Sequence, residues 1–191
     1  MASYDPEQVE FINPEDIPDL GSDDEEWVDN EPRLDVEPAT EEEIQLWWTA
    51  RYDRSIVKPI DTPLTAPWGL PVSSKDLEKL KTGFRTRSMD DKWDLLVEDP
   101  DDKGNVSLHI LRNWEYAELF TLHIVSEDSG GTVIQDITWE GNWNGHRCEA
   151  EQAQKEVVIL CRLFLECEFE TVPQYPTSIM WNGEAYKKLE G

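Results

Sequence analysis

Two short stretches of this sequence gather charged, amide and indole side chains that could bind a ligand or catalyse a reaction. Residues 89–93 read MDDKW and residues 109–114 read HILRNW. A guanidinium beside indole rings can hold an anionic or planar ligand by charge and stacking, and a nearby carboxylate can serve as general acid or base. The candidate ligand-binding residues are Arg112, Asp90, Asp91, Trp93, Asn113 and Trp114.

The same patch has a structural interpretation, and other candidate sites are weaker. Arg112 and Asp90 could form a bidentate ion pair that fixes the end of a sheet. Two histidines and a carboxylate are an adequate ligand set for a transition metal, and His109, His123 and Asp136 would supply them if they shared a face. No catalytic residue is assigned, and we expect no metal and no cofactor, since the sequence has no phosphate loop, HExxH or GxSxG motif.

Alternating apolar and polar residues predict the sheet that would position this patch. Four segments alternate with period two and are separated by turn signals; they are residues 93–98, 106–111, 119–125 and 132–139. Short turns between them predict an antiparallel meander. If the first two strands form a hairpin, Asp90, Asp91 and Arg112 lie close together at one end of the sheet.

Apolar residues recur with the period of an α-helix both before and after these strands in the sequence. Residues 147–167 carry a long apolar stripe that includes Cys161, so we expect a helix over one sheet face and a buried, inert thiol within it. A capping box at Thr40 predicts a helix over residues 40–53. A shorter helix is expected at 74–82, capped by Ser73 and ended by Gly83.

The remaining segments are expected to be connectors. Residues 55–73 have a proline at every fourth position from Pro59, which excludes a helix and favours extended chain. Near the C-terminus a short strand is possible at residues 178–181. The predicted fold class is therefore α+β: a four-stranded antiparallel meander packed against a long C-terminal helix, with an additional N-terminal helix.

Charge divides the chain into two parts. The net charge is −25, and in residues 1–43 the only basic side chain is Arg33. Such a segment cannot bury enough apolar surface to fold alone. We therefore expect a disordered acidic arm over residues 1–39 and a single α+β domain over 40–191. The negative field repels nucleic acid and anionic membranes, so we expect neither as a partner.

Cysteine usage and the N-terminus indicate a reducing compartment. The three cysteines are Cys148, Cys161 and Cys167, an odd number that forms no disulfide framework. His146 with Cys148 is a weak candidate for a nucleophile pair. No apolar signal region and no apolar run of about 20 residues is seen. We expect a cytoplasmic or nuclear protein.

The MDDKW and HILRNW segments resemble a pattern found in small proteins of bacteria and fungi. In those proteins an M-[DE]-D-[KR]-W segment opens a strand and an H-R-[NS]-W segment closes the next. Here Ile110 and Leu111 separate His109 from Arg112, which departs from that pattern. The resemblance covers about residues 84–140 and implies a compact α+β domain with no assigned activity.

Two functions follow from these features. The leading prediction is a non-enzymatic binding or adaptor protein, whose acidic arm and tryptophan-rich sheet end contact a protein partner with a basic surface. Nine tryptophans support the second contact. The alternative is an enzyme or a small-ligand binder that holds an anionic or planar ligand with Arg112, Asp90, Trp93 and Trp114.

Overall fold

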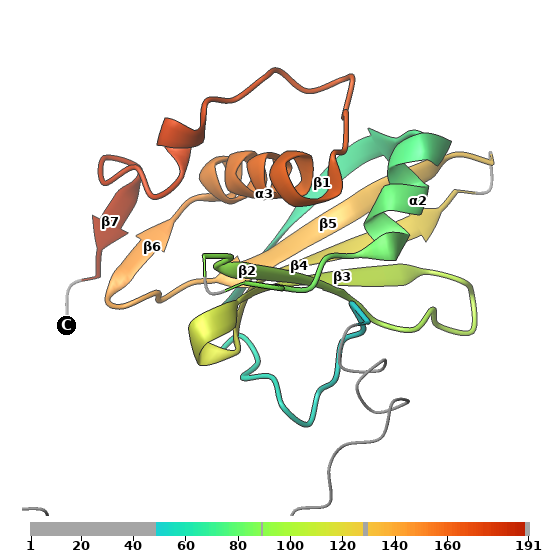
Figure 1. The fold of residues 1–191 in the computed structure, drawn as a ribbon. Coiled ribbons are helices and arrows are strands. Elements are labelled where there is room, and N and C mark those ends of the chain that lie inside the picture. Colours follow the sequence, from blue (N-terminus) through green and yellow to red (C-terminus); the bar gives the residue numbers. More distant parts are fainter. Residues whose placement is uncertain (1–48, 89, 128–129, 190–191) are drawn as a thin grey trace, which may run out of the picture. The chain divides into compact units, whose positions relative to one another are not determined.

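The structure is a computed structural model that describes residues 49–88, 90–127 and 130–189 (Figure 1). The expected acidic arm at 1–39 and most of the expected helix at 40–53 lie outside the described residues.

A five-stranded antiparallel sheet forms the centre of the fold, which is α+β as predicted (Figure 1). Its strands in sequence order are β1 Pro63–Val72, β2 Trp93–Val97, β3 Val106–Arg112, β4 Ala117–Ser126 and β5 Thr132–Glu140. In space their order is β1-β5-β4-β3-β2. The sheet therefore has one strand more than the expected four.

The additional strand β1 lies in the proline-rich segment that was expected to be a connector. Pro63, Pro67 and Pro71 are exposed, and β1 is an edge strand that, within the described part of the chain, pairs with β5 alone. A proline lacks the N–H group that a central strand needs, but an edge strand tolerates it. A register shift between Pro67 and Leu70 also accommodates Gly69, whose φ is +67°. Proline spacing alone therefore concealed an edge strand.

Two helices cover one face of the sheet (Figure 1). Helix α2, Ser74–Thr82, has the expected cap, because the Ser73 side chain accepts a hydrogen bond from the Asp76 backbone N–H at 3.0 Å. Gly83 ends it with a φ of +64°. A β-carbon there would lie 2.7 Å from the Leu95 carbonyl oxygen. Glycine is required at this position for both reasons.

The C-terminal helix is shorter than predicted. Helix α3 spans Ala150–Leu165 rather than 147–167, because strand β6, His146–Cys148, pairs with β7, Tyr186–Lys188. Cys161 is fully buried in α3 as expected, and this burial raises its pKa. Residues 177–179 form the 3₁₀ helix η3, Thr177–Ile179, where a short strand at 178–181 was considered possible.

The opposite face of the sheet is crossed by a segment that we call the strap, residues 50–60 (Figure 1). The expected helix at 40–53 is wrong at its C-terminal end. There the Tyr52 N–H donates to Val97 O at 3.0 Å and the Val97 N–H donates to Ala50 O at 2.8 Å. Strand β2 is the sheet edge, and its unpaired backbone groups are satisfied by extended chain rather than by a helix.

The strap is also held at its other end and in its middle. The Lys58 N–H donates to Tyr116 O at 2.8 Å. Val57 packs with Leu96 and Leu111 in a small apolar cluster, separate from the main core under the helices. The strap therefore covers only part of this sheet face and leaves the rest open.

Candidate functional site

The site predicted from the sequence is only partly assembled in the structure. Arg112 and Trp93 lie opposite each other on β3 and β2, and the Arg112 guanidinium carbon lies 5.0 Å from the centroid of the Trp93 ring. This distance is typical of a cation–π contact. Trp93 itself is buried and stacks on Trp181, with ring centroids 6.1 Å apart. The indole is thus a core side chain that supports the arginine.

The acidic side chains of the predicted site do not pair with Arg112. Asp91 accepts hydrogen bonds from the backbone N–H groups of Arg87 and Ser88, each at 3.2 Å, and Asp90 is exposed. Within the described residues no ion pair joins Arg112 to Asp90 or Asp91. The expected Arg–Asp pair is therefore wrong, because Asp91 stabilises the turn before β2 instead.

The two remaining predicted residues lie in the connection between β3 and β4. The 3₁₀ helix η2, Asn113–Glu115, contains both of them. The Asn113 N–H donates to Lys92 O at 3.1 Å, which ties the connection to the start of β2. Trp114 is 66% exposed. The predicted site therefore consists of a supported arginine and, beside it in the chain, one exposed indole.

A buried polar cluster that the sequence did not predict lies under the strap. Glu118 of β4 is 6% exposed and His109 of β3 is 5% exposed. The His109 Nδ1 atom lies 2.6 Å from Glu118 Oε1, the Tyr52 hydroxyl donates to Glu118 Oε2 at 3.1 Å, and the Thr121 hydroxyl also donates to this carboxylate. The Tyr52 ring stacks on His109 with centroids 3.6 Å apart. We call these four residues the covered cluster.

Besides Tyr52, a second contact links the covered cluster to the strap, through Glu98 and Arg54. His109 Nε2 lies 3.4 Å from Glu98 Oε2, and Glu98 accepts from Arg54 of the strap at 2.7 and 3.0 Å. Burial acts to raise the pKa of Glu118, but hydrogen bonds from His109, Thr121 and Tyr52 hold it below its usual value. Every polar group here has a partner, so the cluster anchors the strap and leaves no group free for a ligand.

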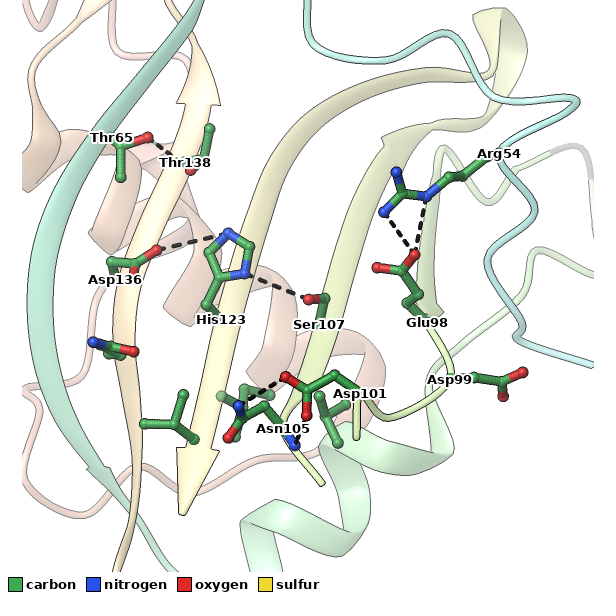
Figure 2. Close-up of a pocket in the computed structure, with 14 residues that line it drawn as sticks. Arg54, Thr65, Glu98, Asp99, Asp101, Asn105, Ser107, His123, Asp136 and Thr138 are labelled. Atoms are coloured by element: carbon green, nitrogen blue, oxygen red, sulfur yellow. Dashed lines mark hydrogen bonds and ion pairs between the residues drawn. The ribbon is translucent and has the colours of Figure 1, made fainter. Parts of the chain in front are cut away.

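Beside the strap, an open groove of about 730 Å³ lies over the uncovered part of the sheet (Figure 2). On its floor Ser107, His123 and Asp136 occupy directly opposed positions on β3, β4 and β5. His123 Nδ1 lies 3.4 Å from the Ser107 hydroxyl, and His123 Nε2 lies 3.7 Å from Asp136 Oδ1. The His123 side chain is 43% exposed. We call these three residues the open cluster.

The wall of the groove is acidic. Four carboxylates line the groove: Glu98, Asp99, Asp101 and, on the floor, Asp136. Among the described lining residues the one arginine or lysine is Arg54, which pairs with Glu98, and Asp99 pairs with Arg51 of the strap at 2.8 Å. Asp101 accepts hydrogen bonds from the Asn105 backbone and side chain and from the Lys103 N–H, and these bonds keep its pKa below the usual value. The groove therefore presents fixed negative charge to solvent.

The proposed metal ligands are divided between the two clusters. His109 faces Glu118, whereas His123 faces Ser107 and Asp136. In the part of the chain that the structure describes, no group of three or more histidine, cysteine, aspartate or glutamate side chains is arranged to hold a metal ion. His146 is exposed and Cys148 is buried, with its pKa raised to about 11 by burial. This thiol is a poor nucleophile at neutral pH.

Comparison with known proteins found no matching family model, no similar curated protein and no similar solved structure. Among the described residues, neither helix has the length and apolar content needed to cross a bilayer. The functional argument therefore depends on the chemistry of the groove and its surroundings.

Proposed function

We propose that this protein binds a protein partner with a basic surface, and that the open groove receives a lysine- or arginine-bearing segment of that partner. The observation that supports this is the charge of the groove: of the four carboxylates that line it, Glu98 and Asp99 pair with arginines, and Asp101 and Asp136 form no ion pair with an arginine or lysine among the described residues. A cationic segment entering the groove replaces water beside fixed negative charge. Complementary potentials of this kind give specificity and fast association.

The rest of the sequence strengthens this attraction. The net charge is −25, and the acid-rich residues 1–43 precede the strap in the chain. Long-range attraction from such a charge distribution steers a basic partner toward the protein and raises its association rate, in a manner that salt screens. In this adaptor function the acidic residues supply steering and the groove supplies the specific contact.

The tryptophan-rich end of the sheet is the second contact that we propose. Trp93 is buried, and Trp143 packs against Trp181 with ring centroids 6.3 Å apart. Trp114 differs from them, because two-thirds of its surface is exposed. An exposed indole is a common energetic centre of protein interfaces, so Trp114 is the member of this group that would touch the partner.

The test uses the full chain and a labelled peptide of alternating lysine and serine, with binding followed by fluorescence anisotropy. The double variant Asp101→Asn/Asp136→Asn neutralises the two groove carboxylates that do not pair with an arginine. The matched control Glu170→Gln/Glu184→Gln removes the same charge from exposed residues outside the groove. We expect the groove variant to weaken binding about tenfold at low salt and the control to weaken it about twofold or less. Equal losses in both variants would assign binding to net charge, and an unbound wild type would refute the proposal.

A small anionic ligand at Arg112 is the second candidate function. The supporting observation is that Arg112 lies over the Trp93 ring and, within the described residues, forms no ion pair with the neighbouring aspartates. A phosphate-bearing compound that raises the melting temperature of the wild type but not of Arg112→Ala would support such a site. Equal shifts in the two proteins would remove Arg112 from it.

A further inference from the structure

The open cluster has a second property besides charge, since it combines a hydroxyl, an imidazole and a carboxylate. We propose that Ser107, His123 and Asp136 form a nucleophilic site for carboxylic esters within the groove. This inference rests on the groove of the proposed function for its substrate preference. The chemistry itself depends only on these three side chains.

Their placement on the sheet gives the site a rigid frame. Ser107 is paired with His123, and His123 is paired with Asp136, on three adjacent strands of which none is at the sheet edge. All three side chains point into the groove (Figure 2). Functional groups on paired strands are positioned more precisely than groups on loops.

A β-bulge places the carboxylate on this face. Successive strand residues alternate between faces, so a regular β5 would put Asp136 on the same side as Ile134, which is in the core. The register shifts between His123 and Ile124, opposite Asp136 and Ile134, and leaves Gln135 as the extra residue. Asp136 is thereby turned toward His123. Bulges that redirect a side chain in this way are frequent next to active sites.

The roles of the three residues follow from their order. The Asp136 carboxylate favours the tautomer with the proton on His123 Nε2. That tautomer leaves the Nδ1 lone pair to accept the proton of the Ser107 hydroxyl. The separations of 3.4 and 3.7 Å are longer than good hydrogen bonds. Catalytic contacts often shorten only when the substrate is bound, and the half-exposed His123 ring has room to move.

The groove also has a donor for the oxyanion. Asn105 precedes Ser107 by two residues and lines the same groove (Figure 2). Its Nδ2 atom donates one hydrogen bond to Asp101 Oδ2 at 2.9 Å, which fixes the amide and leaves a second N–H. We assign this N–H to the carbonyl oxygen of the substrate, where negative charge develops.

The reaction is a balanced acyl transfer with water as the second reactant. The Ser107 oxygen attacks the ester carbonyl carbon, and its proton passes to His123 Nδ1. The C–O bond to the leaving alcohol breaks, and that alcohol takes the proton from His123. Water, deprotonated by His123, then hydrolyses the acyl-serine to a carboxylic acid and free Ser107. Because Glu98, Asp99 and Asp101 line the groove, the preferred ester carries a cationic group.

The test uses the full chain with p-nitrophenyl acetate, a small neutral ester that does not need the acidic wall. Release of p-nitrophenolate reports the reaction, and peptide mass spectrometry locates the acetyl group. We expect acetylation of Ser107 in the wild type and its loss in Ser107→Ala. His123→Gln should slow acylation by about 100-fold or more.

Two matched variants separate the site from background reactivity. Ser126→Ala removes an exposed serine from the same sheet, and His146→Gln removes an exposed histidine outside the groove; neither should change the rate. No acetyl group on Ser107, or an acylation rate that His123→Gln leaves unchanged, would overturn the inference. Neither result would bear on the proposed binding of a basic partner, which the lysine-peptide experiment tests separately.

Discussion

Two histidines on the same sheet face have opposite surroundings. His109 of β3 is almost completely buried, whereas the side chain of His123 on β4 is 43% exposed. His109 is stacked under Tyr52 and faces a carboxylate with each ring nitrogen. His123 faces a hydroxyl and a carboxylate across wider gaps.

The strap accounts for this difference. It supplies the ring that covers His109 and the Arg54 guanidinium that pairs with Glu98, and it leaves His123 open to the groove. Buried polar groups that are fully hydrogen-bonded specify one packing arrangement. Open ones remain available to a ligand. We therefore attribute a structural role to the covered cluster and the proposed binding and reaction to the open cluster.

The largest expected loss of stability comes from removing the carboxylate of the covered cluster. Glu118→Ala removes the acceptor of buried His109 and Thr121 and of half-buried Tyr52. Each buried donor left unsatisfied costs about 1–3 kcal/mol, so we expect a total loss of about 3–5 kcal/mol. Urea unfolding should show a loss of this size in the free energy of unfolding. A loss under about 1 kcal/mol would mean that the strap is held mainly by its backbone bonds.

The pH dependence of stability should differ between the wild type and Glu118→Gln. The folded-state pKa of Glu118 lies below its unfolded value, so its ionised form stabilises the folded protein. That contribution is fully present above the unfolded pKa of about 4.3 and is lost as the pH falls through the lowered folded value. The difference in unfolding free energy between the two proteins should therefore stay constant from pH 6 to about 5 and narrow as the pH falls below about 4.3 and through the lowered folded value. A difference that stayed constant over the whole range would assign the effect to lost packing instead of charge.

Local sequence patterns were sufficient for much of the fold. The cap at Ser73, the end of the helix at Gly83 and the burial of Cys161 depend on neighbours in the chain or on one apolar stripe, and all three were predicted. Strand β1 and the extended start of the strap were not. Both depend on pairing with strands distant in sequence, and the proline spacing and the capping box gave the stronger local signals.

The candidate sites were hidden for a related reason. A register shift between Ile110 and Leu111 turns Glu118 toward His109, and the second shift turns Asp136 toward His123. A bulge inverts the inside–outside alternation from which sequence patterns are interpreted. His123 and Asp136 were considered as metal ligands, but Ser107 was not connected with them because strand register had to be known first. The one sequence signal for this bulge was that the alternation of apolar and polar residues in residues 132–139 breaks at Asp136.

Of the variants considered, His123→Ala is expected to change stability least. Its comparison with His109→Ala tests directly whether the two histidines have different roles. His123→Ala removes a half-exposed ring whose nearest polar contacts are 3.4 and 3.7 Å away. Substitutions at such positions usually change the unfolding free energy by no more than about 0.5 kcal/mol. The equivalent variant at the covered position, His109→Ala, loses a stacked and buried ring and should be destabilised by several times that amount.

Urea unfolding of the two variants under one set of conditions measures this contrast. If His123→Ala proves as destabilising as His109→Ala, the open cluster is part of the framework that holds the sheet together. In that case the bulge at Gln135 would serve to satisfy a structural histidine, and the groove would keep only its charge as a functional feature. If the stability is unchanged, an imidazole, a hydroxyl and a carboxylate are held together at a position where the fold does not need them, as the proposed ester site requires.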